Sequence, residues 1–310
     1  MIVKRIPSID NRYKVKQYQA GSGTNACDSC GCAPEENKDD LKRLLSGLNS
    51  LIGMDKVKKL VSEIKDYITI QQERKNKGLL AEPLVLHMIF KGNPGTGKTT
   101  VARILGKAFA RMGLLSKGHL TEVERADLVG EYIGHTAQKT REVIKKSLGG
   151  ILFIDEAYSL ARGGEKDFGK EAIDTLVKAM EDYKDDLVLI LAGYRGEMEI
   201  FLRSNPGLRS RFPIHMEFPD YKIEELVEIA ELMTRNREYA LSAGAKDKVR
   251  EILYDNADRG ELIMGNARYV RNLIERAIRK QAVRLAKEKR VTREMLIALE
   301  RQDIMEAMEK

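Results

Sequence analysis

The stretch GNPGTGKTT, residues 92–100, contains the spacing Gly-x4-Gly-Lys-Thr, which is typical of a loop that binds nucleotide phosphates. An apolar run precedes it and a helical pattern follows it, as such a loop requires. Glycines let backbone N–H groups curl around phosphates, and the helix N-terminus adds positive potential. We expect Lys98 to reach the β- and γ-phosphates of ATP and Thr99 to ligate Mg²⁺. The other loop residues expected at the nucleotide are Gly92, Asn93, Pro94, Gly95, Thr96, Gly97 and Thr100.

Two adjacent carboxylates end a second apolar run, ILFIDE at residues 151–156. In open parallel sheets ligands bind at the carboxyl ends of the strands, so this run would bring Asp155 and Glu156 to the phosphates. We expect Asp155 to hold Mg²⁺ through water and Glu156 to orient and deprotonate the attacking water. A glutamate that activates the attacking water favours hydrolysis of ATP over phosphoryl transfer to a substrate hydroxyl.

The stretch NPGLRSRFP, residues 205–213, presents two arginines just before a short apolar run. Arginine stabilises charge on a transferring phosphoryl group, and in an oligomer it can act on the ATP of a neighbouring subunit. We expect Arg209 or Arg211 to have this role, and we favour Arg211 because it stands beside the start of the predicted strand. An ordinary surface salt bridge is the alternative.

The elements around these motifs indicate an α/β fold with a parallel sheet. Short apolar runs alternate with patterns of helical periodicity, which is typical of a parallel sheet covered by helices on both faces. Strands are expected at 84–90, 119–125, 149–155, 187–193 and 213–218, and helices at 54–78, 99–113, 136–148 and 169–183.

Beyond residue 221 the strand patterns stop, and amphipathic helices are expected at 222–242, 246–258, 267–288 and 293–308. We therefore divide the chain into three parts. Residues 1–40 form a flexible polar tail, residues 41–220 an α/β nucleotide-binding domain, and residues 221–310 a small all-helical domain.

The composition favours a cytoplasmic protein without a membrane segment. The longest apolar runs fall far short of the roughly 20 residues that a membrane helix needs, and the N-terminus has no apolar signal region. All three cysteines, Cys27, Cys30 and Cys32, lie in the stretch CDSCGC, which favours a reducing compartment over a disulfide framework. Three thiolates are one ligand short of a closed zinc site, so a flexible tail with reactive thiols is favoured over a metal site.

The net charge of +7 comes mainly from one segment, residues 268–290, which has nine basic and two acidic residues. We favour a solvated helix face or a subunit interface. Nucleic-acid contact is the alternative, and it is less favoured because no aromatic residue accompanies the charges after Tyr269. His87 lies in a predicted buried strand, where a hydrogen-bonded core histidine is expected.

Together, the phosphate loop, the ILFIDE run, the LRSRF arginines and the helical segment after residue 221 resemble the AAA+ ATPases. The stretch GNARYVRNLIERA resembles the sensor-2 segment of that family, which implies that Arg268 contacts the γ-phosphate. The stretch LIGMDKVKK, residues 51–59, resembles the box that lines the adenine pocket and includes Ile52 and Gly53. Tyr194 falls at the sensor-1 position, where many members have Asn or Thr, so its role as sensor 1 stays open.

The family resemblance also gives a use for GEYIGHT, residues 130–136. AAA+ proteins of this kind form hexameric rings, and an aromatic–hydrophobic–glycine triplet in the first pore loop grips a polypeptide. Tyr132, Ile133 and Gly134 match that triplet, and glycine lets such a loop move. The alternative is a turn whose tyrosine packs on its own subunit. The segment 161–168, ARGGEKDF, is a weaker candidate for a second pore loop.

Within the AAA+ proteins, the chain resembles the branch of stage V sporulation protein K and the CbbX-type rubisco activases, and its motifs resemble the sporulation members most. This resemblance rests on three longer stretches, ERADLVGEYIGHTAQKT, GGILFIDEAYSLARGGEKDFGKEAIDTLVK and NPGLRSRFP. The resemblance implies an ATP- and Mg²⁺-dependent hexamer that threads or remodels a protein client, with a sporulation role ranked above enzyme reactivation. A DNA-directed motor and a nucleotide-controlled scaffold are the alternatives.

Overall fold

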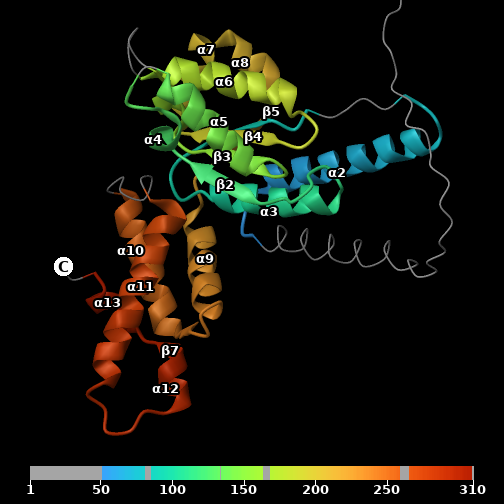
Figure 1. Ribbon diagram of the computed structural model, residues 1–310. Helices are drawn as coiled ribbons and strands as arrows, with labels where there is room; N and C mark the ends of the chain where they lie inside the picture. Colours follow the sequence, from blue (N-terminus) through green and yellow to red (C-terminus); the bar gives the residue numbers. More distant parts are fainter. Residues whose placement is uncertain (1–50, 81–84, 133, 163–167, 259–264, 309–310) are drawn as a thin grey trace, which may run out of the picture.

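The computed structural model describes residues 51–80, 85–132, 134–162, 168–258 and 265–308. Figure 1 shows a sheet with helices on both faces and, below it, a group of helices formed by the C-terminal third of the chain. The tail cysteines, Ile133 and residues 163–167 lie outside the described residues.

Five parallel strands form the sheet, in the order β2-β3-β4-β1-β5. Because the chain passes from central β1 to the β2 edge and later returns to add β5 on the other side of β1, the order reverses at β1, and such a point is where open sheets bind ligands. The strands are β1 (Met88–Gly92), β2 (Leu120–Val123), β3 (Ile151–Ile154), β4 (Val188–Gly193) and β5 (Ile214–Phe218).

Alternate strand residues face opposite sides, so the sheet separates two apolar cores. Ile151 and Phe153 pack with α2 (Asp55–Asn76) and α3 (Lys98–Arg111) on one face. Leu152 and Ile154 face the other side and its helices. That side is covered by α4 (Arg125–Leu128), α5 (His135–Ser147), the 3-10 turn η1 (Ala157–Ala161), α6 (Gly169–Asp182), α7 (Arg195–Ser204) and α8 (Pro206–Arg211).

The C-terminal helices from α9 to α13, here called the lid, have their own apolar core, formed mainly by the three longest of them and α13. Its helices are α9 (Ile223–Arg235), α10 (Ala243–Asp258), α11 (Asn266–Leu285), α12 (Arg293–Ile297) and α13 (Arg301–Glu306). The lid also contains two short parallel strands, β6 (Ala240–Leu241) and β7 (Ala298–Leu299). The expected helices 222–242 and 293–308 were therefore wrong in extent: the first ends at Arg235, and the second is interrupted by β7.

A buried amide explains the interruption at β7. Gln281, on α11, is 3% exposed, and its Nε2 donates to the carbonyl oxygens of Met295, Leu296 and Ala298 at 2.7–3.1 Å. These carbonyl oxygens lie at the end of α12, where no further helical turn donates backbone N–H groups to them. The backbone N–H of Ser242 adds a bond to the Leu299 carbonyl oxygen at 3.0 Å.

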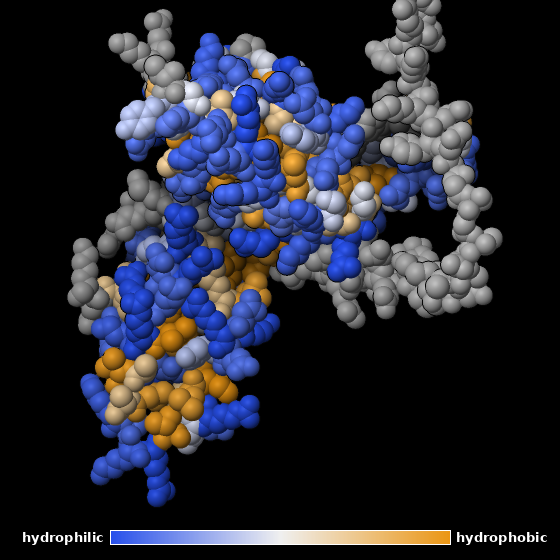
Figure 2. Space-filling view, viewed as in Figure 1, coloured by the Kyte–Doolittle hydropathy of each residue, from blue (hydrophilic) through white to orange (hydrophobic). Residues whose placement is uncertain are grey.

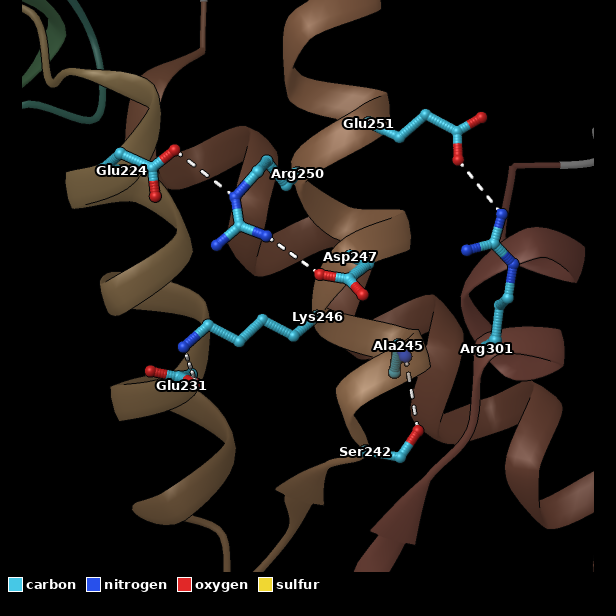
Figure 3. A network of polar contacts seen from close by, with 9 residues as sticks. All are labelled: Glu224, Glu231, Ser242, Ala245, Lys246, Asp247, Arg250, Glu251 and Arg301. Carbon is cyan, nitrogen blue, oxygen red and sulfur yellow. Dashed lines mark hydrogen bonds and ion pairs between the residues drawn. The ribbon is translucent and has the colours of Figure 1, made fainter.

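Ion pairs on the lid surface join α9 to α10 and α10 to α13. Figure 3 shows Arg250 between Glu224 and Asp247, with Lys246 on Glu231 and Arg301 on Glu251. A further pair is inside: both oxygens of Asp303, whose side chain is 1% exposed, accept from Arg284 at 2.8 and 2.9 Å. This buried pair fixes α13 against α11.

Apolar surface gathers at the tip of the lid, over α12 and β7 (Figure 2). Val291 and Leu296 are exposed there. Among the described residues, no helix is both long and apolar enough to cross a membrane.

Candidate nucleotide site

A cavity of about 380 Å³ lies between the carboxyl edge of the sheet and the lid. Its wall includes the segments that directly follow β1 and β3, the last residue of β4 and the start of α11, so it lies at the point where the strand order reverses. The residues expected at the nucleotide that line it are Ile52, Pro94, Gly95, Gly97, Lys98, Thr99, Thr100, Asp155, Glu156, Tyr194 and Arg268. Gly92, Asn93 and Thr96 belong to the same loop but are not among its lining residues.

The phosphate loop is held by its own lysine. The Lys98 ammonium donates to the carbonyl oxygens of Gly92 and Asn93 at 2.8 and 2.9 Å. Burial lowers the pKa of Lys98, while the nearby Asp155 carboxylate acts in the opposite direction. Gly97, the N-cap of α3, has a φ of 92°, which only glycine adopts without strain. A cation at the end of this loop, beside a helix N-terminus, is suited to bind phosphate.

The two acidic residues sit where β3 ends. Glu156 has a left-handed φ of 46°, and its backbone N–H donates to Asp155 Oδ1 at 3.0 Å. The Thr99 hydroxyl donates to Glu122 Oε1 at 3.3 Å. Thr99 and Asp155 share the cavity wall and supply the hydroxyl and carboxylate oxygens that Mg²⁺ prefers, so these residues fit that ion. The sequence did not predict Glu122 at this place.

A buried tyrosine lies beside Glu156, two residues further along the chain. Tyr158 is 5% exposed, and its ring lies 5.9 Å from that of Tyr194. Burial raises the pKa of Tyr158, and a hydrogen bond with Glu156 acts in the same direction. The Arg162 guanidinium lies over the Tyr158 ring, 4.7 Å from its centroid. Tyr194 therefore lines the cavity as an aromatic ring packed on the residue that bonds to Glu156.

An apolar wall of the cavity is formed jointly by the segment before α2 and by helix α9 of the lid. Leu51, Ile52 and Met54 come from the segment before α2, and they face side chains of α9. Such a slot accepts a flat base. The α9 residues are Ile229, Leu232, Met233 and, at the C-cap of the helix, Asn236. Gly53 does not line the cavity: a Cβ there would lie 2.7 Å from Glu225 Oε1, which indicates close packing on α9.

The lid contributes two arginines to the cavity, one of which the sequence analysis missed. Arg268 lines it as expected, and Arg271 lines it as well. Because side chains three residues apart lie on the same helix face, the placement of Arg268 already implied that of Arg271. Tyr221, in the connector before α9, completes this side, and its hydroxyl lies 3.4 Å from the carbonyl oxygen of Thr96.

Arg209 and Arg211 do not line the cavity of their own chain. Both lie on the short helix α8. Arg211 bonds to Glu181 of α6, at 3.0 Å from Nη2 and 3.2 Å from Nε, and to the Gly207 carbonyl oxygen. Arg209 is exposed and forms no ion pair with the described residues.

The tyrosine of GEYIGHT is held away from the core. Tyr132 is 65% exposed, and its ring makes an edge contact with His135, with centroids 5.5 Å apart. Gly134 has a φ of 82°, and a Cβ there would meet nothing within 4 Å. The predicted partner Ile133 and most of the segment 161–168 lie outside the described residues. Most of the tyrosine side chain is thus open to solvent.

The prediction of a core histidine at His87 is confirmed. His87 is 4% exposed, its Nδ1 accepts from the Leu189 backbone N–H at 3.1 Å, and its ring lies 5.9 Å from that of Phe212. Burial lowers its pKa to about 4, so the ring is neutral at pH 7.

Comparisons with known protein families match both parts of the chain. The model of the ATPase family associated with various cellular activities (AAA) matches residues 88–220, and that of the AAA lid domain matches residues 222–310. The chain belongs to this AAA family of ATPases, and the predicted α/β sheet domain with a helical lid is confirmed.

Several relatives are similar over most of their length. Stage V sporulation protein K of Bacillus subtilis (strain 168) is 56% identical over 265 residues, which cover 85% of this chain and 82% of that protein. Protein CbbX of Cereibacter sphaeroides is 48% identical over 246 residues, 79% of each chain. The chloroplastic ribulose bisphosphate carboxylase/oxygenase activase of Cyanidioschyzon merolae is 42% identical over 276 residues, 88% of this chain and 92% of that one. The predicted branch is thereby confirmed.

Solved structures share the fold at low identity. The RuvB Holliday junction branch migration motor of Thermotoga maritima has a TM-score of 0.52 and 21% identity, covering 84% of this chain and 70% of its own. The FIGL-1 AAA domain in complex with ADP has a TM-score of 0.55 and 17% identity, covering 84% and 82%. The chain thus shares its fold with these structures.

Proposed function

We propose that this ATPase works as a ring, most simply a hexamer, in which ATP lies between subunits and its hydrolysis remodels a protein client. One observation carries the proposal: Arg209 and Arg211 lie on α8, outside the cavity of their own chain. A guanidinium that assists phosphoryl transfer has to reach the phosphates. These arginines would therefore serve the cavity of a neighbouring copy, and head-to-tail contacts of that kind form a ring when the rotation between neighbours closes.

Within each cavity the residues divide the work. Lys98 and the backbone of the phosphate loop would hold the β- and γ-phosphates, and Arg268 would contact the γ-phosphate from the lid. Thr99 and Asp155 would hold Mg²⁺, which neutralises charge on the phosphate oxygens. Glu156 would orient and deprotonate the attacking water, supported by the Tyr158 hydroxyl.

Tyr132 is proposed to grip the client. Its exposure and the open space around Gly134 suit a side chain that meets a passing polypeptide. The basic segment 268–290 gives less support to a DNA motor than its charge suggests. Arg268 and Arg271 line the nucleotide cavity, and Arg284 is paired with Asp303. These three charges are therefore not available to a phosphate backbone.

The relatives suggest two kinds of client. The similarity to stage V sporulation protein K supports a role in sporulation, and the similarity to a rubisco activase supports reactivation of an enzyme. We rank sporulation first because the identity of 56% is higher than 42%. We also propose the division into the α/β domain, residues 41–220, and the lid, residues 221–310, since the two family matches meet at residues 220 and 222.

A trapping experiment tests the client. The variant Glu156→Gln should bind ATP and hydrolyse it slowly, so that a gripped protein stays bound. Proteins retained from a lysate with ATP would be identified by mass spectrometry and compared with those retained by Glu156→Gln/Tyr132→Ala. The matched control is Tyr254→Ala, which removes another exposed tyrosine, in the lid. Loss of one protein only with Tyr132→Ala supports the proposal. Retention that ignores Tyr132, or capture of nucleic acid in place of protein, contradicts it.

A further inference from the structure

The first residue of α11, Asn266, has an unusual environment. It is 1% exposed and has a left-handed φ of 44°, a conformation that side chains other than glycine adopt rarely. It stands two residues before Arg268, where the start of α11 meets the phosphate loop. A strained, buried polar residue at such a junction is kept in place by its surroundings.

Those surroundings are polar contacts to both parts of the chain. The Asn266 Nδ2 donates to Asp220 Oδ1 at 2.8 Å and lies 3.4 Å from the Pro94 carbonyl oxygen, while its Oδ1 accepts from the Tyr221 backbone N–H at 3.0 Å. Both donor directions of the amide nitrogen are therefore used, and the amide oxygen accepts one bond. Asn93 Nδ2 donates to both oxygens of Asp220 at 3.0 Å.

The three side chains therefore connect three segments. Asn93 belongs to the phosphate loop, Asp220 to the connector between β5 and α9, and Asn266 to the start of α11. The backbones also touch: the Ala267 N–H donates to the Gly95 carbonyl oxygen at 3.3 Å, and a Cβ on Gly95 would lie 2.3 Å from the Gly265 carbonyl oxygen. The phosphate loop and the start of α11 are therefore in direct backbone contact.

We propose that Asn93, Asp220 and Asn266 form a latch that transmits the conformation of the phosphate loop to the lid and thereby positions Arg268. The inference rests on the proposed role of Arg268 at the γ-phosphate. Asn266 is a positioning residue, since it acts through α11 and not on the nucleotide. Nucleotide binding bends the loop, the latch carries that movement to the connector and α11, and the lid changes its angle.

Two substitutions of Asn266 separate the latch from simple packing. Asn266→Asp keeps the shape but removes both donors and places a second carboxylate against Asp220, so the two should repel. Asn266→Gly adopts the left-handed φ freely, so any defect reports the missing side chain and not backbone strain. The matched control is Asn272→Asp, the same change on an exposed position of the same helix.

The lid angle would be measured by electron spin resonance between labels at Lys107→Cys, on α3, and Arg279→Cys, on α11, both exposed. All labelled proteins derive from one parent variant, in which serine replaces the three tail cysteines and glutamine replaces Glu156, so that bound ATP persists. Labelled subunits are diluted with unlabelled ones. Binding of ATP and ADP is measured with fluorescent analogues. Steady-state kcat and KM are measured with Glu156 intact.

In the parent the distance should differ between ATP and ADP. Both latch variants should lose that difference and broaden the distribution, with kcat lowered about fivefold or more and nucleotide affinity changed less than about threefold. Asn272→Asp should match the parent. The latch is overturned if Asn266→Gly keeps both the nucleotide-dependent distance and kcat, or if affinity falls as much as kcat. A parent that binds no nucleotide would instead contradict the proposed function.

Discussion

Substituting Arg211 tests whether one subunit completes the active site of another. In the isolated chain its guanidinium is bound to Glu181 and lies outside the cavity. We predict that Arg211→Ala binds ATP normally but hydrolyses it far more slowly, while Arg209→Ala keeps most of the activity. Glu181→Gln removes only the charge that pairs with Arg211 and serves as the matched control.

The structure sets the relative sizes of these effects. The side chains of Arg211 and Glu181 are 39% and 64% exposed, and such a pair contributes about 0.2–1 kcal/mol. An arginine acting on a transferring phosphoryl group accelerates the reaction by about 10³–10⁵, or roughly 4–7 kcal/mol. The contact with Glu181 is therefore too weak to hold the arginine back. Glu181→Gln should change kcat by less than about fivefold.

The assay is complementation between two inactive variants. Lys98→Ala lacks the phosphate-binding lysine but keeps Arg211, and Arg211→Ala has the opposite defect. In an equal random mixture, about one interface in four combines an intact Lys98 with an intact Arg211 across a head-to-tail contact. ATPase activity should therefore recover to about a quarter of the wild-type rate on mixing, with binding of a fluorescent ATP analogue to Arg211→Ala as the check on folding.

Two results would refute this reasoning. Full ATPase activity in Arg211→Ala would show that the guanidinium takes no part, and the same result with a large loss in Arg209→Ala would transfer the role to Arg209. If the mixture stays inactive although sedimentation shows that the two variants assemble together, the arginine does not act across an interface.

Three further predictions concern single side chains. Asp303→Asn should lower the free energy of unfolding by about 3 kcal/mol, because it leaves Arg284 without its buried charged partner. Glu251→Gln, which breaks an exposed ion pair of the lid, should change that free energy by less than about 1 kcal/mol. Urea titrations followed by circular dichroism measure both variants, and equal losses would contradict the prediction. Tyr158→Phe, which keeps the ring and removes the hydroxyl bonded to Glu156, should lower kcat about tenfold with KM unchanged, and an unchanged kcat would exclude a positioning role. His87 has a folded pKa of about 4, below the ordinary 6.5, so the unfolded chain binds more protons between these values. The contribution of His87 to the free energy of unfolding, on the order of 3 kcal/mol, is therefore complete above pH 6.5 and is lost as the pH falls to 4. If the free energy of unfolding changes with pH equally steeply in this range for the wild type and for His87→Phe, the prediction is refuted.

The sequence was informative wherever the decisive pattern was local. The phosphate loop, the run before Asp155 and all five sheet strands have patterns that span a few residues, and the structure has a strand at each predicted place. The strand order is a property of the whole sheet and was not predicted. Arg271 could have been found, because it lies one helical turn from Arg268.

Other features depend on contacts between distant segments. The pattern of residues 293–308 is helical throughout, but Ala298 and Leu299 pair with β6, and Gln281 of another helix fills the break. Glu122 and Asn266 look like ordinary surface residues in the sequence. Their positions beside Thr99 and the phosphate loop follow only from the sheet order and the return of the lid.

The buried pair between Arg284 and Asp303 has a consequence for synthesis of the protein. The α/β domain with its phosphate loop is translated well before α13, yet the helix that carries Arg268 is held by Gln281 and Arg284 to segments that leave the ribosome later. A nascent chain that stops before residue 298 would contain the phosphate loop but would lack the contacts that Gln281 and Arg284 make within the lid. Competence to hydrolyse ATP should thus appear late in translation, so that truncated products stay inactive even where their sheet has folded.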